Sequence, residues 1–246
     1  MSTYPGGKNG SGVYQWIINQ MPPHKIYVEP FLGGGAILRN KRPAPVASIA
    51  IDVDARAVQA FTTPIPNLRL ICGDALEKLD YMQILVEPTT LVYCDPPYLM
   101  STRSTKQAYY THEFASEEEH TFLLRILRRL PCMVMISGYA SALYDHHLAG
   151  WREETFQTVN RAGKPTIEHL WCNFPVPMEL HDYRYLGSTF RQRERIKRKQ
   201  ARWRARLAKM ESQERYALLS VIADLRPTSP EIAWLANLDI NGDATR

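Results

Sequence analysis

The sequence has 246 residues, of which 45% are hydrophobic and 22% are charged. This composition is close to that of an average globular domain, so it excludes a wholly disordered chain. No apolar run reaches the roughly 18 residues that a membrane-spanning helix needs. The polar, glycine-rich segment Met1–Gly12 has no apolar stretch, which predicts no signal peptide. We therefore expect a cytoplasmic protein without membrane contact.

The net charge of +5 comes from one segment of the chain. Residues 184–209 contain eleven Lys or Arg residues and a single acid, Glu194. The residues on both sides of this segment carry slightly more acidic than basic side chains. A general polycation is therefore excluded, whereas a local contact with a polyanion is favoured.

Short apolar runs alternate with helical patterns over the first 175 residues. Runs of this kind, which lack polar alternation, are typical of strands buried on both faces of a parallel sheet. The predicted strands are Lys25–Val28, Ala47–Ile51, Leu68–Cys72, Leu91–Cys94 and Cys132–Ser137, followed by a hairpin of Glu154–Val159 and Ile167–Phe174. The predicted helices are Val13–Gln20, Gly35–Asn40, Ala55–Phe61 and Ser116–Leu130, the last beginning with a capping box.

These elements predict an α/β fold with a doubly wound, mostly parallel sheet over residues 1–179. A basic helical extension follows over residues 180–246. Its apolar residues form one stripe on a long helix or on two helices, and Ser229-Pro230 begins a short final helix.

The chain contains four widely spaced cysteines, without a C-x-x-C pair. Free, buried thiols are favoured over disulfides or a metal site, so no metal is expected. They are Cys72, Cys94, Cys132 and Cys172.

A glycine turn and an acid mark the first two predicted strands. The segment Val28–Gly35 ends in three glycines directly after a strand, and such a turn lets a backbone approach a ligand. The spacing of a dinucleotide fingerprint is absent, because Leu38 occupies the position of its last glycine. Asp52 ends the next strand, where a doubly wound nucleotide site places the acceptor for a ribose hydroxyl. A simple tight turn and an ordinary strand-end acid remain the alternatives.

The most specific motif is Asp95-Pro96-Pro97-Tyr98 at the end of an apolar strand. Proline fixes the backbone and removes donors, so the Asp95 carboxylate and the Pro96 carbonyl form a rigid pair of acceptors beside the ring of Tyr98. A planar ring that carries an amino group fits this arrangement. Asp74 could accept from a purine amino group, although an N-cap role is the ordinary interpretation.

The ordered set PGGK, EPFLGGG, DVD, GDA, DPPY, SGY and EHLW resembles the DNA adenine methylase (Dam) family of N6-adenine methyltransferases. The resemblance covers about residues 4–175. It implies the methyltransferase fold, S-adenosylmethionine as cofactor, and a flipped adenine held by Asp95, Pro96 and Tyr98. Lys8 would then lie near the methionine carboxylate and Asp52 at the ribose. The residues implied around the cofactor are Tyr4, Lys8, Glu29, Phe31, Gly33, Asp52, Asp74 and Asp95.

The chain departs from the family between Asp74 and Asp95. Many members carry a recognition domain there, whereas this chain has only Ala75–Cys94. Recognition must then come from elsewhere. The candidates able to read base edges are Arg103, Lys106 and Gln107, together with the turn Arg161–Lys164, and those for phosphate contact are Arg191, Arg195 and Lys199. A mobile lid and a solvated helix are the alternatives.

The function expected from these features is site-specific transfer of a methyl group to adenine N6 in duplex DNA, with flipping of the base. The chain is expected to form a homodimer through the C-terminal helix, or to contact DNA there, or both. Methylation of RNA adenine or of cytosine N4, and a non-catalytic DNA-binding regulator, are the alternatives. The target sequence and the presence of a cognate endonuclease stay open.

Overall fold

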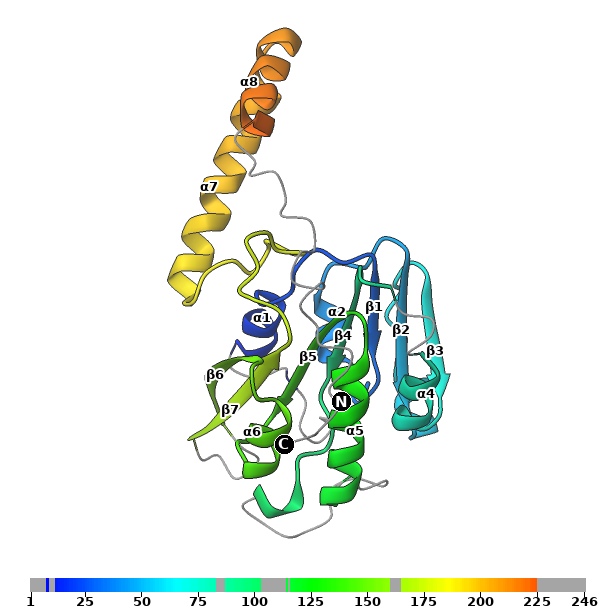
Figure 1. Ribbon diagram of the computed structural model, residues 1–246. Helices are drawn as coiled ribbons and strands as arrows, with labels where there is room; N and C mark the ends of the chain where they lie inside the picture. The colour runs from blue at the N-terminus through cyan, green and yellow to red at the C-terminus, as the bar shows by residue number, and fades with distance from the viewer. Residues whose placement is uncertain are drawn as a thin grey trace.

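The computed structural model describes residue 8, residues 12–82, 87–102, 114, 116–159 and 165–224 (Figure 1). Its centre is a seven-stranded sheet with the order β3-β2-β1-β4-β5-β7-β6, in which the first five strands are parallel and β7 pairs antiparallel with β5 and β6. The strands are β1 (Ile26–Glu29), β2 (Ala47–Asp52), β3 (Leu68–Cys72), β4 (Thr90–Cys94), β5 (Met133–Gly138), β6 (Arg152–Val159) and β7 (Pro165–Cys172).

Helices cover both faces of this sheet, as Figure 1 shows. They are α1 (Val13–Ile18), α2 (Ala36–Asn40), α3 (Ala55–Ala60), α4 (Ala75–Met82), the 3₁₀ turn η1 (Met100–Thr102), α5 (Glu117–Arg129), α6 (Ala142–His147), α7 (Phe190–Ala208) and α8 (Ser212–Asp224). The expected doubly wound α/β fold is confirmed. The expected strands and the hairpin are present with ends shifted by one or two residues, and the first helix ends at Ile18 instead of Gln20.

Two hydrophobic clusters form the core, one on each face of the sheet. Successive residues of a strand point to opposite faces, so Tyr93 packs with α1 and α2 while Val92 and Cys94 pack with α4, α5 and α6. Every residue of β4 is buried. This explains why the strands read as continuous apolar runs.

Local signals placed the α5 boundary correctly. The Ser116 hydroxyl accepts from the Glu119 backbone, and the Glu119 side chain accepts from the Ser116 backbone, so the predicted capping box is present. All four cysteines are free, but Cys72 is exposed because it ends β3, the strand at the sheet edge. Among the described residues, no group of His, Cys, Asp and Glu side chains could hold a metal ion.

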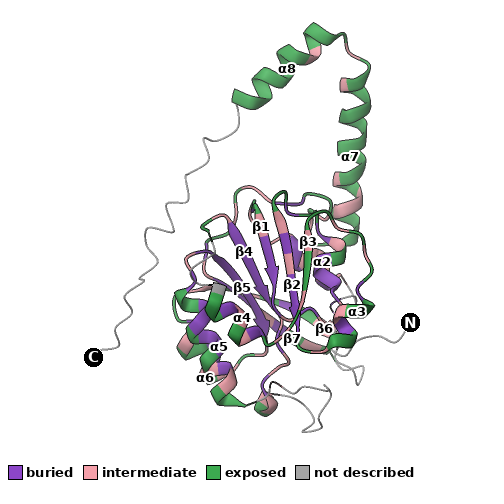
Figure 2. Ribbon diagram, turned by 90° about the vertical axis from the view of Figure 1, so that its right-hand side faces the viewer, coloured by how far each residue is buried: buried purple, intermediate pink, exposed green. Residues whose placement is uncertain are grey.

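The C-terminal extension contains two helices, α7 and α8. Neither contains a buried residue, and α7 projects from the body of the molecule (Figures 1 and 2). The expected helix at Ser229 lies outside the described residues. Within the described part of the chain, no helix is both long and apolar enough to span a membrane.

The extension begins near the amino ends of the parallel strands. The His181 backbone N–H donates to the Met21 carbonyl at 3.0 Å, and the His181 ring stacks on His24 with centroids 3.8 Å apart. Buried Asp182 accepts from the Arg42 backbone at 2.9 Å. These partners precede β1 and β2 in the chain, so they lie near the amino ends of the parallel strands. The extension therefore leaves the core at these amino ends, opposite to the carboxyl ends of the strands.

Candidate functional site

The strand order reverses between β1 and β4, which lie side by side in the sheet. Ligands of doubly wound folds bind beyond the carboxyl ends of the strands at such a switch point. Glu29 ends β1, Asp52 ends β2 and Asp95 follows β4. These residues, which the sequence singled out, therefore come together at the carboxyl ends of the parallel strands.

The glycine turn after β1 is tied to the end of β2 by Asp52. The Gly33 backbone donates to Asp52 Oδ2 at 2.7 Å, and the Asp54 backbone donates to Asp52 Oδ1 at 2.8 Å. Gly33 and Gly35 have φ angles of 49° and 63°, in the left-handed region that favours glycine. Asp54 instead caps α3, because its side chain accepts from the Arg56 backbone. The geometry thus distinguishes buried Asp52 from Asp54.

Glu29 is a buried acid at this edge. Its carboxylate accepts from the Tyr27 hydroxyl at 2.8 Å. Burial, assisted by the charge of Asp95, raises the pKa of Glu29 to about 8 from its usual value of 4.5. The protonated form therefore predominates at neutral pH.

Replacing Glu29 with glutamine should change how stability depends on pH. An acid whose pKa is raised on folding lowers stability as pH rises from the unfolded to the folded pKa. Relative to the unaltered chain, Glu29→Gln should therefore gain on the order of 3 kcal/mol in unfolding free energy between about pH 5 and about pH 8. Buried Lys41, with its pKa lowered to about 7, titrates in both proteins. Urea unfolding at a series of pH values measures the difference, and a difference that does not change with pH would contradict this account.

Four side chains form what we call the Asp95 cluster: Lys8, Asp95, Tyr98 and Glu168. The Lys8 ammonium lies 2.9 Å from Asp95 Oδ1 and 3.0 Å from Glu168 Oε2, and it donates to the Tyr98 hydroxyl. The Tyr98 hydroxyl donates to Glu168 Oε2 at 2.6 Å. Lys8 is only 5% exposed, so this ammonium is held inside the protein by two carboxylates.

The charged groups of the Asp95 cluster shift the pKa values of one another. Burial raises the pKa of Asp95 above its usual range, although Lys8 acts in the opposite direction. Burial by itself lowers the pKa of Lys8, but the two carboxylates outweigh it, and the pKa is raised. Burial and the neighbouring carboxylates raise the pKa of Tyr98. At neutral pH Lys8 is therefore charged and Tyr98 is a phenol.

A hydrogen-bonded pair behind Asp95 fixes its carboxylate. The Ser137 hydroxyl donates to Asp95 Oδ1 at 2.8 Å and lies 3.1 Å from the hydroxyl of buried Tyr93. Tyr139, two residues beyond Ser137, packs edge-on against Tyr98 with ring centroids 4.5 Å apart. All the contacts that the described residues make with the Asp95 carboxylate go to Oδ1.

Glu168 was not among the predicted site residues. Because β7 runs antiparallel to β5 and pairs His169 with Gly138, Glu168 lies beside the carboxyl end of β5. The available signal was an acid next to the apolar run Leu170–Cys172. Such an acid is buried only with a partner, and its partner here is 160 residues away.

The structure places the other predicted residues as follows. Asp74 is exposed, and its carboxylate accepts from the Glu77 backbone at 3.0 Å, the ordinary N-cap role. Pro96 is buried, and the half-buried ring of Phe31 lies 5.4 Å from that of Phe114. Lys8 lies between the carboxylates of Asp95 and Glu168, and its expected contact with a cofactor carboxylate stays a prediction. Tyr4, Arg103, Lys106, Gln107 and the turn at residues 161–164 lie outside the described residues.

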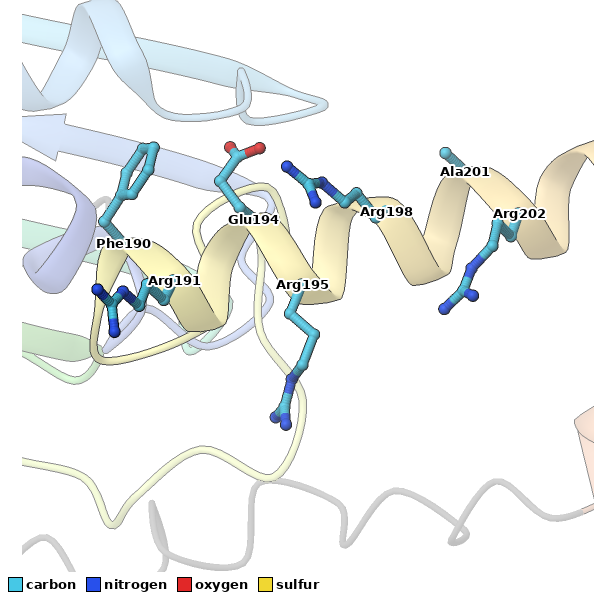
Figure 3. A pocket seen from close by; sticks show the side chains of 7 residues that line it. All are labelled: Phe190, Arg191, Glu194, Arg195, Arg198, Ala201 and Arg202. Carbon is cyan, nitrogen blue, oxygen red and sulfur yellow. The ribbon is translucent and has the colours of Figure 1, made fainter.

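The basic residues of α7 do not join this site. The three predicted phosphate contacts are exposed on α7: Arg191, Arg195 and Lys199. This helix is apart from the Asp95 cluster, because it extends from the amino ends of the parallel strands. Figure 3 shows Arg191, Arg195 and Arg202 pointing to one side of the helix, and Glu194 and Arg198 to the other. The pocket drawn there belongs to this helix and is lined by Phe190, Arg191, Glu194, Arg195, Arg198, Ala201 and Arg202.

Comparisons with solved structures find distant similarity to methyltransferases. One is the S-adenosylmethionine-dependent methyltransferase from Agrobacterium tumefaciens, with 13% identity, a TM-score of 0.43, and coverage of 65% of this chain and 58% of that chain. Another is a putative S-adenosylmethionine-dependent methyltransferase from Streptococcus mutans, with 11% identity, a TM-score of 0.43, and coverage of 65% and 47%. This chain spans about half the length of these proteins. No curated protein matches the sequence.

A family model matches the middle of the chain. Residues 67–159 match D12 class N6 adenine-specific DNA methyltransferase. This range contains Asp74, the Asp95–Tyr98 motif and Ser137, and it excludes the glycine turn and Glu168. The match agrees with the resemblance expected from the sequence motifs, over this part of the chain. Over residues 67–159, this chain is therefore similar to the D12 class of N6 adenine-specific DNA methyltransferases.

Proposed function

We propose that this protein transfers a methyl group from S-adenosylmethionine to the N6 amino group of adenine, at a specific sequence of duplex DNA, after the base has left the helix. The observation that carries the proposal is the Asp95 cluster. There, the acceptors at the end of β4 converge on a single nitrogen with N–H donors, the Lys8 ammonium. An exocyclic amine is also a nitrogen with N–H donors, so it suits the same acceptors.

The residues at the switch point fit the cofactor. Asp52 is buried at the end of β2, where a ribose hydroxyl acceptor is needed, and Gly33 brings backbone close beside it. Glu29 and Phe31 flank the same turn, next to Asp95. When bound there, S-adenosylmethionine supplies a methyl group on a positively charged sulfur.

The chain's own residues then prepare the amine for attack. The N6 lone pair is delocalised into the purine ring, which makes the nitrogen a poor nucleophile. An N–H donated to Asp95, and a second to the Pro96 carbonyl, favour a pyramidal nitrogen whose lone pair points away from the ring. Ser137 holds the Asp95 carboxylate, and the Tyr98 ring orients the purine. Correct alignment and fixed acceptors supply most of the catalysis.

The limited exposure of these acceptors supports the proposal of base flipping. Asp95 is 19% exposed and Glu168 9%, so a base inside a stacked duplex cannot reach them. Enzymes that modify a base in such a site take it out of the stack. Arg103, Lys106 and Gln107 stay the proposed readers of the surrounding sequence.

The test is transfer of labelled methyl groups from S-adenosylmethionine to duplex DNA and to RNA of matched sequence, followed by mapping of the labelled positions. The proposal expects label on duplex DNA at one recurring sequence. Label on RNA alone would favour the RNA enzyme. Binding of DNA without label on either would favour the non-catalytic regulator.

We also propose that α7 binds DNA phosphates at a surface separate from the Asp95 cluster, near the opposite ends of the strands. Arg191 and Arg195 share one side of the helix (Figure 3), and Lys199 follows one turn later. Among the described residues, the one ion pair made by a cation of α7 joins Lys197 to Glu194, at 3.9 Å. The remaining positive charge suits a polyanion.

Neutralising this side of α7 should flatten the salt dependence of DNA binding. Each phosphate contact contributes a slope of about −0.9 in log affinity against log salt. Arg191→Gln/Arg195→Gln should therefore reduce the slope by about 2. The matched control, Lys197→Gln/Arg204→Gln, removes equal charge from the other side of the helix and should leave the slope nearly unchanged. An equal slope in the first variant would assign α7 to assembly with a second copy of the chain.

A further inference from the structure

Lys8 occupies the acceptors that the proposed function assigns to the adenine amine. We infer that Lys8 and the adenine amine exclude one another at these acceptors, and that the carboxylate of S-adenosylmethionine would offer the Lys8 ammonium another partner in place of Asp95 and Glu168. The inference rests on the proposed function and adds an order to it, since the cofactor must bind before the base.

The geometry excludes joint occupancy by Lys8 and the base. Lys8 Nζ lies 2.9 Å from Asp95 Oδ1, donates to the Tyr98 hydroxyl, and sits 4.8 Å from the centroid of the Tyr98 ring. A purine stacked on Tyr98 with its amine at Asp95 would need the same space. Lys8 must therefore move before the base can enter.

A displaced ammonium needs another anion. Leaving a buried charge without a partner is strongly unfavourable, and Lys8 has two carboxylate partners in the Asp95 cluster. The carboxylate is the one anionic group of S-adenosylmethionine. In-line transfer requires the sulfonium beside the amine and hence close to Asp95. Three carbon atoms separate that sulfur from the carboxylate carbon, so the new partner lies within reach of the lysine side chain.

The coupling has a consequence for substrate capture. While Lys8 holds the acceptors, a flipped adenine has no free partner there. A cofactor carboxylate that took over Lys8 would make these acceptors available. Because coupling between two ligands is reciprocal, an adenine in the base site should also tighten the cofactor.

Substitution of Glu168 gives a clear test, because the inference expects tighter binding of the cofactor product, whereas damage to the site would weaken that binding. Glu168→Gln removes one of the two carboxylates that hold Lys8, so less must be broken when Lys8 moves to the cofactor. Calorimetric titration of the full chain with S-adenosylhomocysteine, which retains the amino-acid carboxylate, should show affinity increased by about tenfold. Titration with 5′-methylthioadenosine, which lacks that carboxylate, should show no change.

Three variants support this comparison. In a Lys8→Met background, the Glu168→Gln substitution should no longer alter the affinity for S-adenosylhomocysteine. Glu154→Gln, on the neighbouring strand β6, removes an equal charge outside the cluster and should have no effect. Asp95→Asn loosens the other partner of Lys8, so it serves as a second test if Glu168→Gln does not fold.

The results separate the inference from the proposed function. If the unaltered chain binds S-adenosylhomocysteine and methylates DNA, but Glu168→Gln leaves that affinity unchanged or shifts both ligands equally, the inference alone is overturned. If the unaltered chain binds neither ligand, the proposed function fails together with it.

Discussion

Replacing Asp95 with asparagine is expected to reduce methyl transfer by about 10³-fold, which is the loss typical when a fixed electrostatic partner of the reacting group is removed. Asparagine keeps the shape of the side chain and the volume at the end of β4. It replaces a charged acceptor with an amide that has only one acceptor oxygen. Binding of S-adenosylhomocysteine should not be weakened, because the glycine turn and Asp52 are untouched, and loss of one carboxylate that holds Lys8 should tighten it.

Single-turnover rates and calorimetric titration of the same preparations measure the two effects separately. Asp145→Asn is the matched control, since it makes the same chemical change on the exposed surface of α6 and should leave both quantities unchanged. Methyl transfer at the rate of the unaltered chain in Asp95→Asn would refute the role of Asp95.

Placing a methyl group on Gly35 should destabilise the fold by about 3 kcal/mol, the sum of a left-handed backbone cost and of overpacking. Gly35 has a φ of 63° and precedes α2. A Cβ built there would lie 2.4 Å and 2.7 Å from two ring carbons of Phe61, closer than real contacts allow. Phe61 is buried in the core, so its ring cannot simply move aside.

Gly150→Ala separates the two contributions. Gly150 also has a left-handed φ, 86°, but no atom lies within 4 Å of its added Cβ. We expect this control to lose only about 1 kcal/mol. Urea unfolding of both variants gives the free energies, provided that the dependence on urea concentration is unchanged. Equal losses in the two variants would show that Phe61 does not restrict the turn.

Much of the fold could be predicted because its signals are local. β4 is apolar throughout since helices cover both faces of the sheet, and the Ser116–Glu119 capping box is complete within four residues. The position of Asp95 also follows from sequence, because a strand that ends in two prolines must end there. In each case the residues that decide the structure are neighbours along the chain.

The contacts of the candidate site were less accessible, because they join distant segments. Lys8 is far from Asp95 and Glu168 along the sequence, although its ammonium contacts both carboxylates in the structure. No sequence pattern near residue 8 predicts these partners. Asp52 was predicted because it ends a strand, and the hydrogen bond that it accepts from the Gly33 backbone now gives the physical reason.

The position of α7 could not be predicted from the sequence either. Its charge was evident, but its location depends on the direction of β7. Because β7 runs antiparallel to the central strands, the chain leaves it at the edge opposite to Asp95. His181 and Asp182 then anchor the segment there.

The most direct test of the central claim is the chemical identity of the product. Duplex DNA incubated with the full chain and S-adenosylmethionine is digested to nucleosides and analysed by mass spectrometry. The arrangement of Asp95 and Tyr98 predicts N6-methyldeoxyadenosine, which should vanish with Asp95→Asn. Methyl groups on cytosine, or none on DNA that the protein binds together with the cofactor, would contradict it.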